Sequence, residues 1–424
     1  MRLEKNQLLI GFVPLIDSAP LVAAKEKGFF EKHGLNVELE RHQSWSQIRD
    51  KLAAGALDAA HMLAPMAPAS WLDNAYGGER FVTGLSLNLN GNAITVSEEL
   101  YRQMVEADPE AMFERPTSAR ALKKVIANRL KAGQETINIG TVFPFSSHNY
   151  AVRYWLGAEG LNPDRDVRMV VAPPPYMVEH LKEGKIDAFC VGEPWNTLAE
   201  CDSVGRAIVR SAEIWRHMPE KVLGVRQEWA DEFPETHVAL VASVLEAAAW
   251  LDKRRNRLEI AEILSRNDYI GLQTKALLPS LAGIGALANR KSIIEASDYL
   301  IFHRYAANFP WRSHALWFLT QMARWGQIVS PVDLHEIAQG AYLPEIYRAA
   351  AGRLGVAYPT IDEKPEGAEE HAWMLSEATT PIAMPSSRFV DGFSFNPDAV
   401  ISYLEGFKRH NLRISLREIA DLHS

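Results

Sequence analysis

The stretch LLIGFVPLIDSAPLVAAKEKGFFEKHGLNVEL, residues 8–39, decides the fold class. Its first part, Leu8–Val13, is an apolar run of strand length. Leu21–Lys27 follows as a helical segment that ends at Gly28, and Leu35–Leu39 is a second strand-like run. A strand, a helix and a strand in this order predict parallel strands joined by a crossover helix.

The same alternation continues along the chain and then occurs a second time. In the first occurrence we expect a further helix at Ser46–Ala53 and strands at Leu57–Ala60 and Phe81–Leu87. The second occurrence comprises strands at Ile137–Thr141, Val167–Val171 and Ala188–Val191, with helices at Ser147–Leu156 and Tyr176–Lys182. The sequence therefore predicts an α/β protein with two lobes.

Beyond Thr236 the apolar residues recur at helical spacing, for example in Val238–Leu251 and Ser313–Gln327. We divide the chain into four parts on this basis. Residues 1–95 are the first part of lobe 1, residues 96–196 form lobe 2, residues 197–330 return to lobe 1 and are mostly helical, and residues 331–424 form a C-terminal helical annex packing on the lobes.

Composition excludes several classes of function. The 424 residues include 45 Lys and Arg against 53 Asp and Glu, a formal charge of −8, which argues against nucleic-acid or polybasic membrane binding. Two cysteines, Cys190 and Cys201, are too few for a disulfide framework or a structural zinc site. Histidines such as His61, His148 and His314 are scattered singly, and P-loop, nucleophile-elbow and zincin motifs are absent. We therefore expect no cofactor, no metal and no catalytic residues.

The N-terminal apolar run bears on the cellular compartment. Leu8–Ile16 has the length of a signal-peptide core, and Arg2 and Lys5 precede it. Pro14 interrupts this run, however, and cleavage near Ala19 would remove the first strand. We therefore expect a cytoplasmic protein.

Polar residues follow the predicted strands of the first lobe at their carboxyl ends, where ligands gather in α/β proteins. Trp45 stands at a helix start, and its alternative role is core packing. Asn90 and Gly91 belong to the amide-rich segment Asn88–Asn92, which we expect to be a loop suited to a turn or to an anion.

The second lobe repeats this arrangement. Thr141 ends a predicted strand, and Ser146, Ser147 and His148 then open a helix. Such a start offers hydroxyl groups, backbone N–H groups and the positive end of the helix dipole to an anion, although a serine here is also an ordinary N-cap. Glu193 follows the last strand of this lobe, in a Gly-Glu-Pro segment suited to a crossing between lobes.

Several longer motifs occur together in this chain. They are GFVPL (11–15), AKEKGFF (24–30), GLNV (34–37), WSQIRDKL (45–52), LDAAHMLAPM (57–66), HNYAVRYWL (148–156), IDAFCVGEPWN (186–196), PEK (219–221), SHALWFLTQMARWG (313–326) and FVDGFSFNP (389–397). In this combination, over nearly its whole length, the chain resembles the nitrate-binding family of periplasmic-type solute receptors. The resemblance implies a type II periplasmic-binding-protein fold, with two α/β lobes around an anion-binding cleft and a helical C-terminal annex.

The resemblance also implies a function. The family includes receptors of nitrate and bicarbonate ABC importers, and cytoplasmic nitrate/nitrite sensors of the NasS type. Because the chain starts almost directly at the first strand, it resembles the sensors most. We expect a sensor that binds nitrate or nitrite between the lobes. Binding would release a NasT-like antiterminator, a response-regulator-like RNA-binding protein that controls nitrate assimilation.

Two alternatives remain at this point. One is the solute-binding receptor of a nitrate or bicarbonate ABC importer. The other is an enzyme, since a thiamine-pyrimidine synthase shares the fold. That enzyme has a cysteine-rich motif, which the two separated cysteines of this chain cannot form. We therefore expect no enzymatic activity.

Individual ligand contacts are implied by the resemblance as well. Trp45 matches the family's tryptophan that borders the anion. Asn90 stands where nitrate importers have a glutamine, and it keeps an amide donor. Thr141 stands where some importers have a histidine, and the helix start at 146–148 offers other donors in its place.

The cation that contacts the anion should lie in Arg210–Lys221, where Arg210, Arg216 and Lys221 are the candidates. Nitrate only accepts hydrogen bonds, so its site needs donors and positive charge without a carboxylate facing the ligand. Bicarbonate also donates one hydrogen bond, and its site needs an acceptor. Carboxylates of Glu193 or Asp17 in the cleft would therefore favour bicarbonate.

Overall fold

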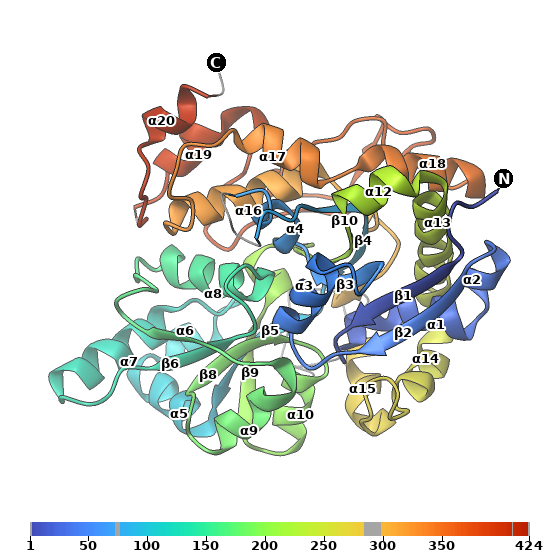
Figure 1. Ribbon diagram of the computed structural model, residues 1–424. Coiled ribbons are helices and arrows are strands. Elements are labelled where there is room, and N and C mark those ends of the chain that lie inside the picture. Colours follow the sequence, from blue (N-terminus) through green and yellow to red (C-terminus); the bar gives the residue numbers. More distant parts are fainter. Residues whose placement is uncertain (1, 73–76, 284–297, 409, 423–424) are drawn as a thin grey trace.

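The computed structural model describes residues 2–72, 77–283, 298–408 and 410–422 (Figure 1). Its first lobe is built on a six-stranded sheet in the order β11-β4-β10-β3-β1-β2. The strands are β1 (Gln7–Phe12), β2 (Asn36–Arg41), β3 (Ala59–Leu63), β4 (Phe81–Asn90), β10 (Pro219–Arg226) and β11 (Leu300–Ile301). β1 is parallel to β2 and β3, which confirms the predicted strand–helix–strand start. β10 is antiparallel to both its neighbours, β3 and β4, and was not predicted.

The second lobe has a five-stranded sheet in the order β7-β6-β8-β5-β9. Its strands are β5 (Asn92–Ser97), β6 (Asn138–Thr141), β7 (Arg168–Val171), β8 (Ala188–Gly192) and β9 (Gly205–Arg210). β6 is parallel to β7 and β8, whereas β5 is antiparallel to β8 and β9. Since β9 pairs with β5, the second sheet extends past residue 196, and the chain returns to the first sheet only with β10.

Helices cover both sheets and make up much of the C-terminal part (Figure 1). In the first 210 residues they are α1 (Ala19–Glu26), α2 (Phe29–Lys32), α3 (Trp45–Ala53), α4 (Met66–Ala69), α5 (Glu98–Ala107), α6 (Pro109–Phe113), α7 (Arg120–Lys131), α8 (Ser147–Ala158), α9 (Met177–Lys182) and α10 (Trp195–Cys201), with the 3₁₀ turns η1 (Ile16–Ser18) and η2 (Pro174–Tyr176). Further along the chain are α11 (Ser211–Ile214), α12 (Gln227–Glu232), α13 (Pro234–Leu251), α14 (Asn256–Leu264), α15 (Thr274–Leu281), α16 (Arg312–Arg324), α17 (Leu334–Ala341), α18 (Pro344–Leu354), the 3₁₀ turn η4 (Pro397–Ala399), α19 (Val400–Glu405) and α20 (Leu416–Ala420). None of the helices in the described ranges is long and apolar enough to cross a bilayer.

The chain passes from the first sheet to the second at Asn90 and Gly91. The prediction of a loop at Asn88–Asn92 is wrong, because β4 extends to Asn90 and β5 begins at Asn92. Asn90 and Gly91 have φ angles of 63° and 93°, and this left-handed backbone turns the chain between the two strands. The amide composition suggested a loop, but these side chains are buried, and Asn88 Nδ2 donates a hydrogen bond to the carbonyl of Asn90 (3.0 Å).

The C-terminal annex lies along one side of both lobes, at the top of Figure 1. α18 packs against α13 and β4 of the first lobe, and α16, which precedes the annex in the chain, contacts α8 of the second lobe. Tyr154 of α8 also donates a hydrogen bond to Asp391 (2.9 Å). Between α18 and α19 the annex is irregular rather than helical, and it contains a hairpin of β12 (Trp373–Leu375) and β13 (Ile382–Met384).

Candidate functional site

A buried lysine lies at the centre of the candidate site. Lys221 belongs to β10, where it is paired with Leu63 of β3 and Asn88 of β4, and its side chain is fully buried. Its Nζ lies 2.7 Å from Oδ2 of Asp17 and also forms an ion pair with Glu220. Burial lowers the pKa of Lys221, but the two carboxylates outweigh it and raise the pKa above its ordinary value. The lysine is therefore charged, and its charge is stabilised by these partners.

Asp17 and His61 approach Lys221 from the first lobe. Asp17 lies in η1, three residues after the end of β1, and its Oδ1 is 2.9 Å from Nε2 of His61 on β3. Burial alone would raise the pKa of Asp17, but Lys221 and His61 hold it far below its ordinary value. Burial lowers the pKa of His61, so its ring is neutral at physiological pH. Its Nδ1 accepts a hydrogen bond from the Val13 amide (3.4 Å), which leaves the Nε2 proton facing Asp17.

Helix α8 brings Ser147 and His148 to the same place from the second lobe. The helix starts after Ser146, whose Oγ accepts a hydrogen bond from the amide of Asn149 (3.0 Å). Ser147 Oγ donates to Glu220, and His148 Nε2 lies 3.1 Å from the other carboxylate oxygen of Glu220. Burial lowers the pKa of His148 to about 4, so this imidazole is neutral at physiological pH too. Glu220 thus links the second lobe to the lysine.

The Trp45 ring covers Lys221. Trp45 is the first residue of α3, and the helix is capped by Ser44, which accepts from the amide of Gln47 (3.3 Å). The Lys221 Nζ lies 5.4 Å from the indole centroid, and His61 meets the ring edge-on at 5.1 Å. The indole is fully buried, so it both packs in the core and offers its face to the ammonium.

Four of the ten residues proposed from the sequence meet at this point: Trp45, Ser147, His148 and Lys221. We call these four, together with Asp17, His61 and Glu220, the Lys221 cluster. The sequence analysis weighed Asp17 only as a carboxylate that favours bicarbonate, weighed His61 only as an isolated histidine, and missed Glu220.

Glu220 was missed for a structural reason. Successive side chains of a regular strand point to opposite faces, so Glu220 and Lys221 should not meet. The pairing of β10 with β4 shifts register on both sides of Lys221, however, and such an irregularity re-aims side chains. The available signals were the acidic residue directly before the lysine and the resemblance of the PEK motif (219–221) to the family.

Two other predicted residues have partners outside the cluster. Asn90 Oδ1 accepts from the amide of Met218 (2.9 Å), and its Nδ2 donates to the carbonyl of Asp298 (2.8 Å). Arg216 Nη1 donates to Ser386 Oγ of the C-terminal annex (2.5 Å). Both side chains hold chain segments together, and their contact with an anion stays a prediction.

Glu193 lies where the lobes cross. Its carboxylate accepts hydrogen bonds from the Tyr299 hydroxyl and from the amide of Thr197, and its carbonyl accepts one from the amide of Ile16. The third candidate cation, Arg210, lies over the Tyr299 ring, 4.7 Å from its centroid. Lys221 is therefore the one candidate cation that belongs to the Lys221 cluster. Asp17 is the one candidate carboxylate that belongs to it, whereas Glu193 lies outside.

The three remaining predicted residues are Thr141, Gly91 and Ser146. Thr141 is buried at the end of β6, and Gly91 lies at the crossing between the sheets. Ser146 Oγ donates to the carbonyl of Phe143 (2.7 Å) in addition to capping α8. Their role as anion contacts also stays a prediction.

Comparisons with known proteins agree with this architecture. Residues 2–265 match the NMT1-like family. The nitrate/nitrite binding protein NrtA of Nostoc sp. PCC 7120 is 31% identical over 416 residues, which cover 96% of this chain and 87% of that protein. The crystal structure of the periplasmic nitrate-binding protein NrtA from Synechocystis PCC 6803 superposes with a TM-score of 0.83 at 28% identity, covering 96% of this chain and 100% of that one.

Two longer relatives come from Synechocystis sp. PCC 6803. The nitrate import ATP-binding protein NrtC is 36% identical over 96% of this chain, and the bicarbonate transport ATP-binding protein CmpC is 38% identical over 95%. This chain spans a little over half of their length, 56% and 55%. All these relatives are named as binding or transport proteins, in agreement with the prediction that the chain is not an enzyme. The predicted two-lobed fold is confirmed, and the chain belongs to the NMT1-like family.

Proposed function

We propose that the chain is a receptor for a small planar oxyanion, nitrate or nitrite, which binds between the two lobes at Lys221. The observation that carries the proposal is the Lys221 cluster itself. It joins an ammonium group and an indole of the first lobe to a serine and a histidine at the start of α8 in the second. A ligand that contacts both lobes stabilises their closed arrangement by its higher affinity for that state. The relatives named as nitrate and nitrite binding proteins support this choice of anion.

Bicarbonate is the second candidate ligand, and a specific observation favours it. The carboxylates of Asp17 and Glu220 both face Lys221, so the cluster already contains two negative charges for one positive charge. Nitrate cannot donate a hydrogen bond to either carboxylate, whereas the hydroxyl of bicarbonate can. The relative named as a bicarbonate transport protein is consistent with this alternative.

We further propose that a partner protein senses the closed state in the cytoplasm. In this scheme a NasT-like antiterminator prefers the open receptor, and nitrate releases it by shifting the population to the closed form. The coupling is reciprocal, so the partner must weaken nitrate binding by the same factor as nitrate weakens partner binding. The support is the resemblance to the NasS-type sensors and the meeting of side chains from both lobes in the Lys221 cluster. A permease of an ABC importer is the alternative partner.

Calorimetric titration of the dialysed full chain with nitrate, nitrite and bicarbonate tests the ligand. We expect saturable binding of nitrate or nitrite, and its loss in Lys221→Gln. Lys182→Gln, an exposed lysine of α9, is the matched control and should bind normally. Binding of bicarbonate alone, lost in Glu220→Gln, would establish the second candidate instead. If none of the three anions binds, the receptor proposal is wrong.

The partner is tested separately. The purified receptor is mixed with the antiterminator encoded in the same genome and passed over a sizing column with and without nitrate. We expect a complex without nitrate and its dissociation with nitrate. A complex that persists while calorimetry shows nitrate bound, or no complex at all, would refute the sensor proposal and leave the receptor proposal intact.

A further inference from the structure

The proposed oxyanion site already holds an anionic group of the chain itself, the carboxylate of Glu220. Ser147 Oγ donates a hydrogen bond to its Oε2, and the Lys221 ammonium contacts its Oε1. His148 Nε2 lies 3.1 Å from the same Oε1. A carboxylate presents two acceptor oxygens in one plane, as nitrite and one edge of nitrate do. Glu220 therefore engages the groups that we propose for the anion, and it does so with the same kind of acceptor.

The Ser147 hydroxyl can serve only one acceptor at a time. A serine hydroxyl carries a single proton, and Glu220 Oε2 accepts it. The Lys221 ammonium carries three protons, of which Asp17 and Glu220 each accept one. An entering anion can therefore share the lysine with both carboxylates. To reach the serine, however, it has to displace the Glu220 carboxylate.

The Glu220 carboxylate leaves other polar groups of the Lys221 cluster unsatisfied. His148 is fully buried, and neither of its ring nitrogens is hydrogen bonded to a residue that the structure describes. The indole Nε1 of Trp45 is a second buried group without a hydrogen-bond partner in the described ranges. Buried polar groups of this kind favour a ligand that satisfies them. A carboxylate tethered to β10 is limited in its position, whereas a free anion takes the position with the best hydrogen bonds.

The hydrogen bond between Ser147 and Glu220 also joins the two lobes. Glu220 lies on β10 of the first sheet, whereas Ser147 is the first residue of α8 in the second lobe. An anion that takes over Ser147 therefore replaces one interlobe contact by another. Only the difference in free energy between the two contacts then favours anion binding. The strength of the Glu220 contact is thus subtracted from the affinity for the anion.

We propose that Glu220 is a built-in competitor of the anion. Before the anion enters, the Glu220 carboxylate holds the Ser147 hydroxyl, and the anion binds by displacing the carboxylate from it. The inference rests on the proposed function, and it adds a residue that lowers the affinity rather than supplying it. The anion concentration at which the receptor responds is therefore set by Glu220 as well as by the donors of the site.

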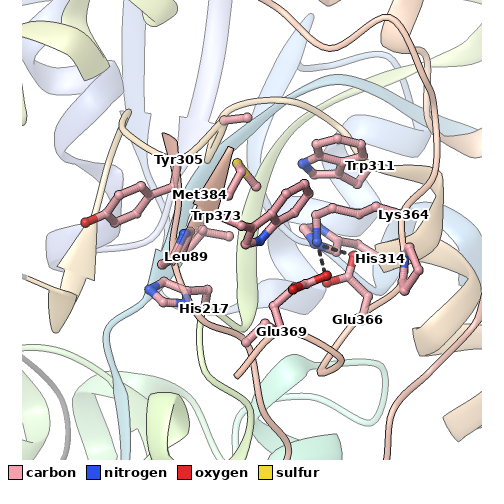
Figure 2. A pocket seen from close by; sticks show the side chains of 14 residues that line it. Leu89, His217, Tyr305, Trp311, His314, Lys364, Glu366, Glu369, Trp373 and Met384 are labelled. Atoms are coloured by element: carbon pink, nitrogen blue, oxygen red, sulfur yellow. Dashed lines mark hydrogen bonds and ion pairs between the residues drawn. The ribbon is translucent and has the colours of Figure 1, made fainter. Parts of the chain in front are cut away.

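A second buried carboxylate, Glu366, provides a matched control. It accepts a hydrogen bond from Ser313 (2.8 Å), and His314 Nε2 lies 3.4 Å from it. Figure 2 shows that the Lys364 ammonium pairs with the same carboxylate. None of these four residues belongs to the Lys221 cluster. Neutralising Glu366 therefore reproduces the chemical change at Glu220 without altering the proposed anion site.

Calorimetric titration of the dialysed full chain with sodium nitrate and sodium nitrite tests the competition. Glu220→Gln should bind the anion at least about tenfold more tightly than the unmodified chain, because a neutral amide holds Ser147 less strongly than a carboxylate does. Glu220→Asp keeps the charge but is one methylene shorter, and it should bind at least about threefold more tightly. Glu366→Gln should bind as the unmodified chain does. A variant that merely folds poorly cannot gain affinity.

A crystal structure of the unmodified chain with nitrate tests the displacement without any variant. We expect Ser147 Oγ to donate to nitrate and the Glu220 carboxylate to be turned away from it. The inference is overturned if Ser147 still donates to Glu220 in that complex, if neither Glu220 variant gains affinity, or if Glu366→Gln gains as much. These outcomes leave the proposed function intact. If neither the unmodified chain nor Glu220→Gln binds nitrate or nitrite, the proposed function is wrong and this inference is wrong with it.

Discussion

Two buried regions of this protein are built from the same four residue types. At the start of α8, Ser147 donates to Glu220, His148 lies 3.1 Å from the same carboxylate, and Glu220 pairs with Lys221. At the start of α16, Ser313 donates to Glu366 (2.8 Å), His314 lies 3.4 Å from it, and Glu366 pairs with Lys364. Each cluster ties a helix start to a distant segment.

The difference between the two clusters is one carboxylate. Glu366 and Lys364 balance each other, whereas Lys221 is shared by Glu220 and Asp17, which leaves a formal charge of −1. A balanced buried pair fixes the structure around it. The unbalanced cluster between the two lobes has one carboxylate charge in excess, which a ligand that donates a hydrogen bond, such as bicarbonate, can offset and nitrate cannot.

The largest expected effect separates the two lysines. Lys221→Gln leaves two carboxylates buried without their cation and should cost about 3–5 kcal/mol of unfolding free energy. Lys364→Gln leaves one such carboxylate, with a serine and a histidine still beside it, and should cost about 1–3 kcal/mol. Urea unfolding of both variants measures these losses of unfolding free energy. Equal losses in the two variants would mean that the second carboxylate, Asp17, adds nothing to the cost of removing Lys221.

Acid stability should depend on the balanced cluster. Burial alone would raise the pKa of Glu366, but Lys364 and His314 lower it to about 2, below that of the unfolded chain. The ionised Glu366 therefore contributes its full stabilisation at pH values above its pKa in the unfolded chain. This stabilisation is lost as the pH falls through the lower pKa of Glu366 in the folded protein. Glu366→Gln should flatten the decline in unfolding free energy between about pH 4.5 and pH 2, measured by urea titration at each pH. An unchanged slope would contradict this.

Anion binding should be coupled to a proton at the unbalanced cluster. The groups that face His148 are Glu220, Lys221 and Asp17, and the ring is neutral because burial lowers its pKa to about 4. A bound nitrate would raise that pKa, so at pH values between the free and the bound pKa the binding takes up a proton and weakens as the pH rises, by up to about tenfold per unit. Calorimetric titrations in buffers of different ionisation enthalpy measure the number of protons taken up on nitrate binding. We expect no such uptake in His148→Gln. An observed heat that is the same in every buffer would refute the coupling.

The smallest expected effect compares the two serines. Ser147→Ala and Ser313→Ala each remove one hydrogen bond to a buried carboxylate and should each cost about 1–3 kcal/mol of unfolding free energy. Only Ser147→Ala should also change the nitrate affinity, by severalfold, because Ser313 lies outside the Lys221 cluster. Nitrate titration of both variants decides this, and a matching loss in Ser313→Ala would remove the functional distinction between the clusters.

Local patterns in the sequence were enough to predict much of the fold and part of the site. Apolar runs located β1, and the serine at residue 146 marked the start of α8, since both depend on residues close in the sequence. β10 was missed because its first residues, Pro-Glu-Lys, are polar or break strands, and tertiary pairing with β3 and β4 overrides that preference. The hydrogen bonds of Asn90 to Met218 and Asp298 could not be predicted, because these partners are far away in the sequence.

The position of β10 has a consequence for biosynthesis. β4 pairs only with β10 and β11 within the described part of its sheet, and both strands come from much later in the chain. A nascent polypeptide therefore emerges from the ribosome with β4 unpaired on both edges until the second lobe has been synthesised. Unpaired edges are prone to association with other chains, so this interval is when a chaperone would protect the protein best. Lys221 enters the sheet in the same step, so the proposed oxyanion site is complete only when this sheet is complete.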